Sequence, residues 1–487
     1  MQSHLRESQS WSRSDTIVVI VVVLVGGLLR FFDLGDPSAL VFDEVHYSKD
    51  ACLYATSSHD LCGIESEANA VHPPLGKWMM AGGIKLFGYD SFGRRIAAAV
   101  AGTITIALVY VLCRRLFHST LGAGFGAGLL AVDFLHFVQS RMAMLDVFLT
   151  LFGVATVLFL VLDRDHAFAH TSGRRPWRVA AGAAAGAAAA TKWPGAAFIL
   201  IALVLSIAWE ARAARGRGDR IIRAVAIEGP SLALSLVLLP AVVYALSYVG
   251  RLDGDVIALP WTSGSWWRAF YDRQVYMFQA LFGIEATHPY QSPAWTWMLV
   301  KRPVSYFYES APDGRVTEIM ALGNPIVWWT SIPALLYVAR RWLTVRDPLR
   351  AEGVILAGAV LTYGPWLLQQ SDRTATFIFY LLPTVPFMCL ALAYVAAEIG
   401  SSMEARAAIV AFQVLTVSSF AFFYPVLANV PLSQGAWEAR IRFNSCSTDP
   451  PVVETKSIVE TRRNATIVRT SLTTTTPSPP TEGWCWI

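Results

Sequence analysis

Long apolar stretches recur along this 487-residue chain and limit the folds open to it more than any other feature. A helix that crosses a bilayer needs about 20 mostly apolar residues. Only 15% of the residues carry charge, whereas a soluble domain has about 25%. We therefore predict an all-α polytopic membrane protein with about eleven transmembrane helices. The expected spans are residues 15–33, 95–113, 121–139, 143–162, 178–191, 194–210, 223–249, 322–340, 353–370, 374–397 and 405–428.

Positive charges predict the orientation of these helices, because Lys and Arg are enriched in the cytoplasmic loops of membrane proteins. With the N-terminus in the cytoplasm, the arginine-rich loops all fall on the inner side. This parity places long outer loops at 35–94 and 250–321. We expect a multi-span membrane domain at 1–428 and an extracytoplasmic tail at 429–487, which is Thr/Pro-rich near its end. The net charge of +4 does not indicate nucleic-acid binding.

Four of the six cysteines fall on the outer side in this topology. Cys52 and Cys62 lie in the first outer loop, and Cys446 and Cys485 lie in the tail. Disulfides form on the oxidising side of a membrane. We predict the pairs Cys52–Cys62 and Cys446–Cys485, with other pairings and buried free thiols as the alternatives.

The first outer loop carries the polar residues best suited to catalysis. The acidic pair Asp43-Glu44 follows the first span, and a carboxylate beside an apolar wall can act as a general base. Further along, the segment His72–Lys77 (HPPLGK) predicts a short helix from Leu75 to Phe87 on the membrane surface. These residues alone also fit a solvated loop with scattered charges.

Other ionisable residues lie at the outer ends of later spans. Arg95 opens the second span, and a guanidinium can bind a phosphate through two hydrogen bonds. Arg141 and Asp146 lie at the turn before the fourth span, and Lys192 lies in a tight turn between spans. An ion pair within the protein, or contact with lipid headgroups, is the alternative for each. The sequence contains no metal-ligand spacing, P-loop or GxGxxG pattern, so it predicts no cofactor and indicates no metal site.

Taken together and in order, these segments resemble the protein O-mannosyltransferases. The resemblance rests first on Phe42–Tyr47, His72–Lys77, Arg95, Ser140–Asp146 and Thr191–Gly195. The segments that are similar to the actinobacterial branch are His288–Trp297, Arg302-Pro303, Gly323-Asn324-Pro325 and Gly483–Trp486. The 250–321 loop is too short for the β-trefoil domain of the fungal and animal enzymes, so an acceptor-binding role of that domain does not transfer to this chain.

The resemblance implies an inverting glycosyltransferase of the C-type fold at the outer face of the plasma membrane. It would move mannose from polyprenyl-phosphate mannose to Ser/Thr hydroxyls of exported, Ser/Thr/Pro-rich proteins, with membrane lipids and the protein export machinery as further partners. Asp43 would be the general base with Glu44 in support, and Arg95 and Lys192 would bind the donor phosphate. The residues expected to shape the site are His72, Lys77, Arg141, Asp146 and His288.

Two other functions are compatible with the sequence. A related lipid-linked-sugar transferase would act on a glycolipid or a cell-wall polysaccharide. A transporter of lipid-linked sugars is less favoured, because such folds usually show internal repeats and we find none. The Thr/Ser/Pro run at 470–480 also resembles an acceptor segment, which suggests that the enzyme modifies its own tail.

Overall fold

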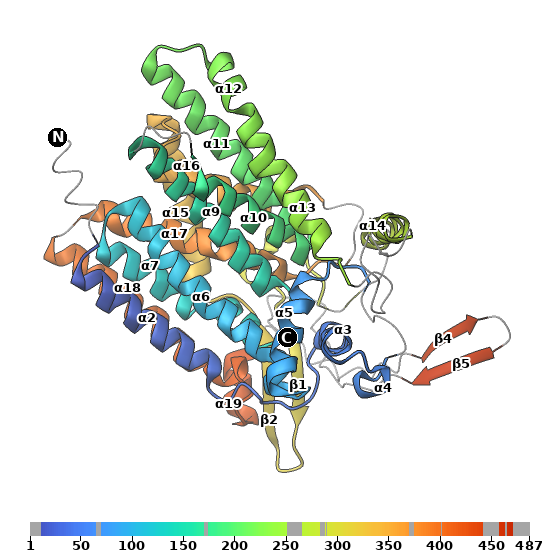
Figure 1. The fold of residues 1–487 in the computed structure, drawn as a ribbon. Coiled ribbons are helices and arrows are strands. Elements are labelled where there is room, and N and C mark those ends of the chain that lie inside the picture. Colours follow the sequence, from blue (N-terminus) through green and yellow to red (C-terminus); the bar gives the residue numbers. More distant parts are fainter. Residues whose placement is uncertain are drawn as a thin grey trace.

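The computed structural model describes residues 11–64, 70–169, 174–250, 265–282, 288, 290–369, 375–400, 402–441, 457–462 and 465–470. Long helices form a bundle, and shorter elements gather at one end of it (Figure 1). The helices of the bundle are α2 (Arg13–Phe31), α6 (Ser91–Phe117), α7 (Thr120–Ala131), α8 (Phe134–Gln139), α9 (Asp146–Ala169), α10 (Pro176–Thr191), α11 (Ala196–Arg217), α12 (Ile221–Ala233), η2 (Leu234–Leu238), α13 (Leu239–Leu246), α15 (Pro325–Val345), α16 (Ala351–Leu368), η4 (Ile378–Thr384), α17 (Val385–Ile399) and α18 (Met403–Leu427).

Each of the eleven expected spans overlaps at least one of these helices. Within the described part of the chain, eight helical segments are long and apolar enough to cross a membrane. The other three expected ranges form α7 with α8, α10 and α15, which are too short or insufficiently apolar by the same measure. The prediction of a polytopic helical membrane protein is thus confirmed.

Small residues explain how the short helix α10 packs inside the bundle. A Cβ atom placed on Gly182 would lie 1.7 Å from the carbonyl oxygen of Ser235. A Cβ atom on Gly186 would lie 2.7 Å from Cα of Pro240. Glycine at both positions therefore lets the backbone of α10 touch the helix that runs through η2 and α13.

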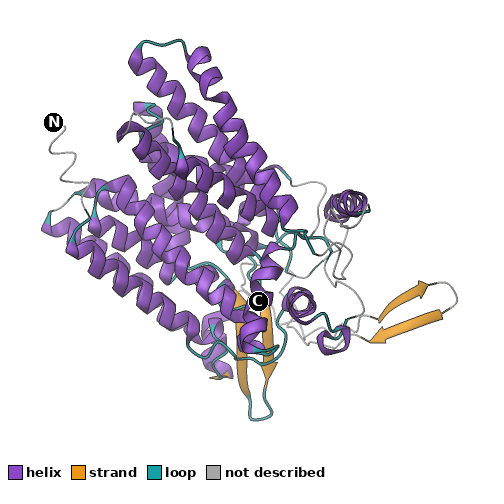
Figure 2. Cartoon of the chain, in the orientation of Figure 1, coloured by secondary structure: helices purple, strands orange, loops and turns teal. Residues whose placement is uncertain are grey.

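The prediction of an all-α fold is wrong at one end of the molecule. Strands β1 (Val304–Ser310) and β2 (Arg315–Ala321) form an antiparallel hairpin with Val304 opposite Ala321, and β3 (Leu432–Ser433) pairs with the start of β2. A second hairpin joins β4 (Ser457–Arg462) to β5 (Ala465–Thr470), as Figure 2 shows. The β1 sequence VSYFYES is rich in aromatic and β-branched residues, which favour strands.

Four shorter helices belong to the same end of the molecule: α3 (Glu44–Thr56), α4 (His59–Cys62), α5 (Leu75–Phe87) and α14 (Trp266–Phe282). Figure 1 shows α3 and α14 end-on, whereas the bundle helices run across the view. Helix α5 confirms the helix predicted from Leu75 to Phe87.

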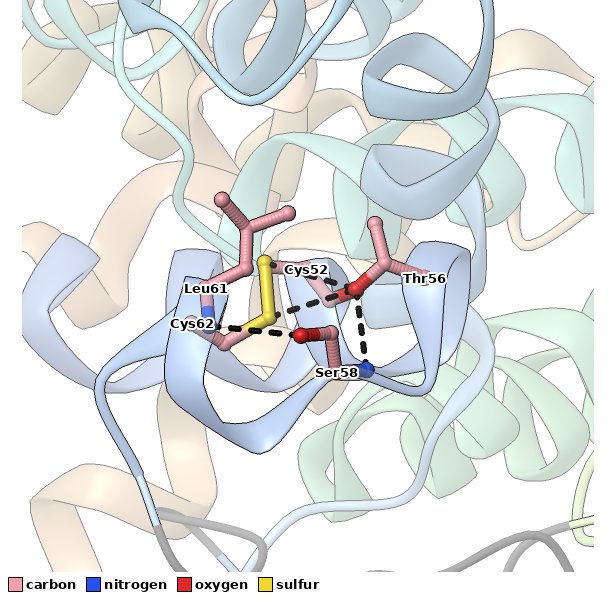
Figure 3. The surroundings of a disulfide bond; sticks show 5 residues. All are labelled: Cys52, Thr56, Ser58, Leu61 and Cys62. Carbon is pink, nitrogen blue, oxygen red and sulfur yellow. Dashed lines mark hydrogen bonds between the residues drawn. A yellow bond between two sulfur atoms is a disulfide. The ribbon is translucent and has the colours of Figure 1, made fainter.

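The predicted disulfide between Cys52 and Cys62 is present and ties α3 to α4 (Figure 3). The hydroxyl of Thr56 lies beside it and donates a hydrogen bond to the carbonyl oxygen of Cys52 at 2.8 Å. Ser58 caps α4 by accepting a hydrogen bond from the backbone N–H of Leu61 at 3.3 Å. The disulfide therefore closes a compact turn after α3.

The start of the predicted tail packs against the rest of the protein. Helix α19 (Gln434–Ile441) buries Trp437, whose indole N–H donates to Glu318 on β2 at 2.6 Å. The predicted boundary at residue 428 therefore does not separate residues 432–441 from the β1–β2 hairpin. Cys446 and Cys485, the second predicted pair, lie outside the described residues.

Candidate active site

The acidic pair Asp43-Glu44 lies at the start of α3. Asp43 is the residue before the helix, and it follows Phe42, whose φ of 48° is left-handed. The ring of Phe42 stacks on Tyr306 of β1 with 4.5 Å between the centroids. This tight turn presents Asp43 at a half-buried position, where its carboxylate accepts a hydrogen bond from the hydroxyl of Tyr47 at 3.2 Å.

Several charges face the carboxylate of Asp43. Burial raises the pKa of Asp43 above its usual value, while the positive charges of His46 and Lys192 act in the opposite direction. The nearby carboxylate of Asp146 adds to the increase. A partly desolvated carboxylate with a raised pKa is a stronger base than a solvated one, as general-base catalysis requires.

Glu44 points away from this position and is fully buried. Its two oxygens accept hydrogen bonds from Arg95 at 2.8 and 2.9 Å. They also accept from the backbone N–H groups of Val41 at 3.0 Å and Ala143 at 2.8 Å. Burial alone would raise the pKa of Glu44, but Arg95 and Arg94 hold it below its usual value. Glu44 therefore joins the segment after α2 to α6 and to the turn before α9.

The geometry does not support the predicted contact between Arg95 and the donor phosphate. The remaining N–H groups of Arg95 donate to the carbonyl oxygens of Leu34, Pro37 and Ala39. All five N–H groups of the guanidinium are thus used within the protein. The structural role of Arg95 was not predicted from the sequence, because its partner, Glu44, lies 51 residues away along the chain.

Lys192 is the other residue that was expected to bind the donor phosphate. Its ammonium lies 3.0 Å from both oxygens of Asp146, and it lies 4.7 Å from the ring centroid of Tyr380. The 3₁₀ turn η1 (Trp193–Gly195) follows it directly. The positive charge of Lys192 also acts to lower the pKa of Asp43, after burial and His46 in order of effect.

A cavity of about 190 Å³ opens beside Lys192. Most of its wall is apolar or aromatic, and Lys192, His72 and Gln369 supply polar groups. Such a cavity suits a ligand with one anionic group and an apolar remainder. The other residues that line it are Trp193, Pro194, Ala197, Leu281, Leu361, Thr362, Pro365, Trp366 and Tyr380.

Lys77 and Arg141, two residues expected to shape the site, act from inside the scaffold. Lys77 forms a fully buried ion pair with Asp50 at 2.9 Å, which joins α5 to α3. Arg141 donates to the backbone carbonyl oxygens at the end of α2, including those of Leu29 and Asp33. A guanidinium at a helix C-terminus satisfies carbonyls that have no partner in the helix. Both residues therefore position the site without reaching the cavity.

His72 and His288 each pack against an aromatic residue near Asp43. His72 lines the cavity, and its ring lies 5.9 Å from that of Tyr47. His288 packs edge-on against Phe42 and Phe377, with centroid distances of 6.4 and 5.1 Å. His288 thus packs against the residue that precedes Asp43.

Sequence reasoning missed Tyr47, Tyr306 and Asp50. Tyr47 follows Asp43 by four residues, a spacing that places the two on one face of a helix, so this contact was detectable. Tyr306 and Asp50 are recognised only through contacts that the fold creates. Among the described residues, no group of three or more His, Cys, Asp and Glu side chains is placed to hold a metal ion.

Comparison with solved structures defines the class of the fold. The protein O-mannosyltransferase Pmt1-Pmt2 complex of S. cerevisiae, solved with the sugar donor, matches with a TM-score of 0.73 at 16% identity and covers 90% of this chain and 93% of its own. ArnT from Cupriavidus metallidurans, bound to undecaprenyl phosphate, matches with a TM-score of 0.52 at 17% identity over 84% of this chain and 65% of its own. The fold is that of the C-type membrane glycosyltransferases.

Sequence comparison then gives the family. The model of the dolichyl-phosphate-mannose-protein mannosyltransferases matches residues 20–250, and that of the C-terminal four-helix region of protein O-mannosyltransferases matches residues 266–445. Polyprenol-phosphate-mannose–protein mannosyltransferases of Mycolicibacterium smegmatis and Mycobacterium tuberculosis are 31% and 32% identical, covering 90% and 87% of this chain and 93% and 90% of their own. The chain belongs to the protein mannosyltransferase family.

Proposed function

We infer that this protein transfers mannose from polyprenyl-phosphate mannose to Ser/Thr hydroxyls of exported proteins. The observation that carries the inference is that Lys192 lines a largely apolar cavity and that its charge also acts on the carboxylate of Asp43. The cavity suits the phosphate and the first isoprene units of the donor, and Asp43 faces the place where an acceptor hydroxyl would meet the sugar. The relatives that share the fold and most of the chain carry the same activity in their names.

Asp43 would act as the general base. The acceptor oxygen attacks the anomeric carbon from the face opposite the phosphate, and its proton passes to the carboxylate of Asp43. The bond between the anomeric carbon and the phosphate oxygen breaks, and polyprenyl phosphate leaves with the electron pair. A phosphate leaves as a stable anion, so the reaction needs no general acid. Attack from the opposite face inverts the configuration of the sugar.

Lys192 would stabilise the leaving phosphate. Its ammonium is anchored by Asp146 and faces the cavity, so its charge is in place before the phosphate gains negative charge. Preorganised charge of this kind lowers the barrier without a reorganisation cost. Asp146 would act as a positioning residue, because it holds Lys192 and contributes to the pKa of Asp43.

The protein would work at the outer face of the plasma membrane. The arginine-rich loops support this orientation, because they favour the cytoplasmic side and leave the Asp43 loop outside. Acceptors would then arrive as exported chains, with the protein export machinery as a neighbour.

The experiment is a transfer assay in membranes with labelled polyprenyl-phosphate mannose and a Thr/Pro-rich peptide. We expect label on the peptide, and none when every Ser and Thr of the peptide is replaced by Ala. Label found only on lipid or polysaccharide would overturn the proposed acceptor and favour a glycolipid or polysaccharide transferase. Uptake of the donor without any transfer product would favour a transporter.

A further inference from the structure

A polar cavity lies at the end of the bundle remote from Asp43. It has a volume of about 270 Å³ and is lined by residues from the end of α6, from α9, from the start of α16 and from α17. Helix α6 carries Arg95 in its first turns and Arg115 near its last, and 27 residues of helix span about 40 Å. The cavity is therefore separate from the site described above.

Arginines dominate the charge of this cavity. Arg115, Arg164 and Arg350 line it together with two carboxylates. Each carboxylate near the cavity already has a cation as its partner. The pairs are Arg350–Glu352 at 3.0 Å, Arg341–Glu398 at 3.2 Å and Arg164–Asp165 at 2.8 Å.

Arg115 supplies the excess positive charge. It is exposed, and within the described part of the chain no carboxylate lies at ion-pair distance from it. The guanidinium of Arg350 bonds to Glu352 through Nε and also contacts the hydroxyl of Tyr394, and its side chain is still 41% exposed. Guanidinium groups in this arrangement match a phosphate oxygen pair.

An apolar groove continues from the cavity along the flank of the bundle. It lies between α15 and α17, has a volume of about 460 Å³ and shares Glu398 with the wall of the polar cavity. Its lining is mostly apolar, with Pro333, Ala334, Leu392 and Val395 among the residues. A groove on the side of a membrane helix bundle meets the acyl chains of the bilayer.

We propose that the cavity and the groove together bind one anionic phospholipid. Its phosphate lies between Arg115 and Arg350, and one acyl chain lies along α15 and α17 in the groove. The combination selects an amphiphile with a net negative headgroup, because a zwitterionic headgroup brings its own cation to the arginines.

The test measures lipid binding to the full chain purified in neutral detergent. Native mass spectrometry and thermal unfolding are followed while phosphatidylglycerol, phosphatidylcholine or inorganic phosphate is added. We expect one tightly bound phosphatidylglycerol and a rise in Tm, with weaker effects of phosphatidylcholine. Inorganic phosphate equal to phosphatidylglycerol in effect would overturn the role of the groove. Equal binding of the two lipids would overturn the role of the arginines.

Variants test the two halves of the site separately. The double variant Arg115→Gln/Arg350→Gln should weaken phosphatidylglycerol binding by about tenfold or more, the loss expected from charge-assisted hydrogen bonds. Val395→Trp should fill the groove and weaken lipid binding while leaving the arginines in place. Arg215→Gln, at an exposed position near the end of α11 and outside both cavities, is the matched control and should bind as the wild type does. Wild-type affinity in Val395→Trp and in the double variant would refute the site.

Discussion

The ammonium of Lys192 lies 3.0 Å from each carboxylate oxygen of Asp146. Asp146 is the first residue of α9, and Lys192 directly follows the last residue of α10. The pair is almost fully buried, with side-chain exposures of 6% and 3%. It therefore fixes a positive charge next to Asp43, at the junction of two helices in the bundle.

Replacing Lys192 by Met should reduce kcat/KM by about 100-fold or more, the effect typical of removing one preorganised electrostatic contact. The change also leaves the carboxylate of Asp146 buried without its ion-pair partner. Breaking a buried pair in this way costs about 3–5 kcal/mol of stability. The double variant Lys192→Met/Asp146→Asn removes both charges and should recover part of the lost Tm. Its transfer rate should stay low, and recovery of the rate along with Tm would refute a role of Lys192 in transfer.

The raised pKa of Asp43 predicts how transfer depends on pH. The base acts as a carboxylate, so kcat/KM should fall as the pH drops through a pKa that lies above the usual 3.8. His46 is exposed, and its charge lowers this pKa. His46→Gln should therefore move the acidic limb of the profile to higher pH, whereas His59→Gln in the same loop should leave it unchanged. A shift to lower pH, or none, would contradict the assignment.

The Glu44–Arg95 pair should matter for stability and not for donor recognition. Breaking this fully buried pair with Arg95→Met should cost about 3–5 kcal/mol, seen as a lower Tm. Because Arg95 has no free N–H group, the KM for polyprenyl-phosphate mannose should change by less than about threefold, under 1 kcal/mol. A large rise in the donor KM at unchanged Tm would restore Arg95 as a phosphate ligand.

The disulfide between Cys52 and Cys62 should stabilise the segment that contains α3 and α4. The double variant Cys52→Ser/Cys62→Ser removes a closed loop with a sequence separation of 10, which corresponds to about 2–3 kcal/mol. Reductant should lower the Tm of the wild type and leave that of the double variant unchanged. Cys389→Ala is the control, since Cys389 is a buried free thiol and its variant should keep the response to reductant.

Local patterns in the sequence predict much of this fold. The apolar stretches predicted the helices of the bundle, and the prolines of His72–Lys77 predicted the start of α5. The fold also brings residues of separate motif segments together, since Lys192 pairs with Asp146 and both charges act on Asp43.

Long-range contacts explain what the sequence did not reveal. The role of Arg95 depends on Glu44 and on backbone carbonyls that only the folded loop brings near. The β1–β2 hairpin was overlooked because a search for long apolar spans does not detect seven-residue strands. The docking of α19 depends on Trp437 reaching Glu318, 119 residues earlier in the chain.

The most direct test of Asp43 as the base compares donor binding with transfer in Asp43→Asn. Its control is Asp219→Asn, at an exposed carboxylate paired only with Arg217 in the described structure. We predict that Asp43→Asn binds polyprenyl-phosphate mannose with nearly wild-type affinity and transfers mannose about 100- to 10,000-fold more slowly, the range of general-base catalysis. Transfer by Asp43→Asn at a rate close to that of Asp219→Asn would contradict the assignment of Asp43 as the base.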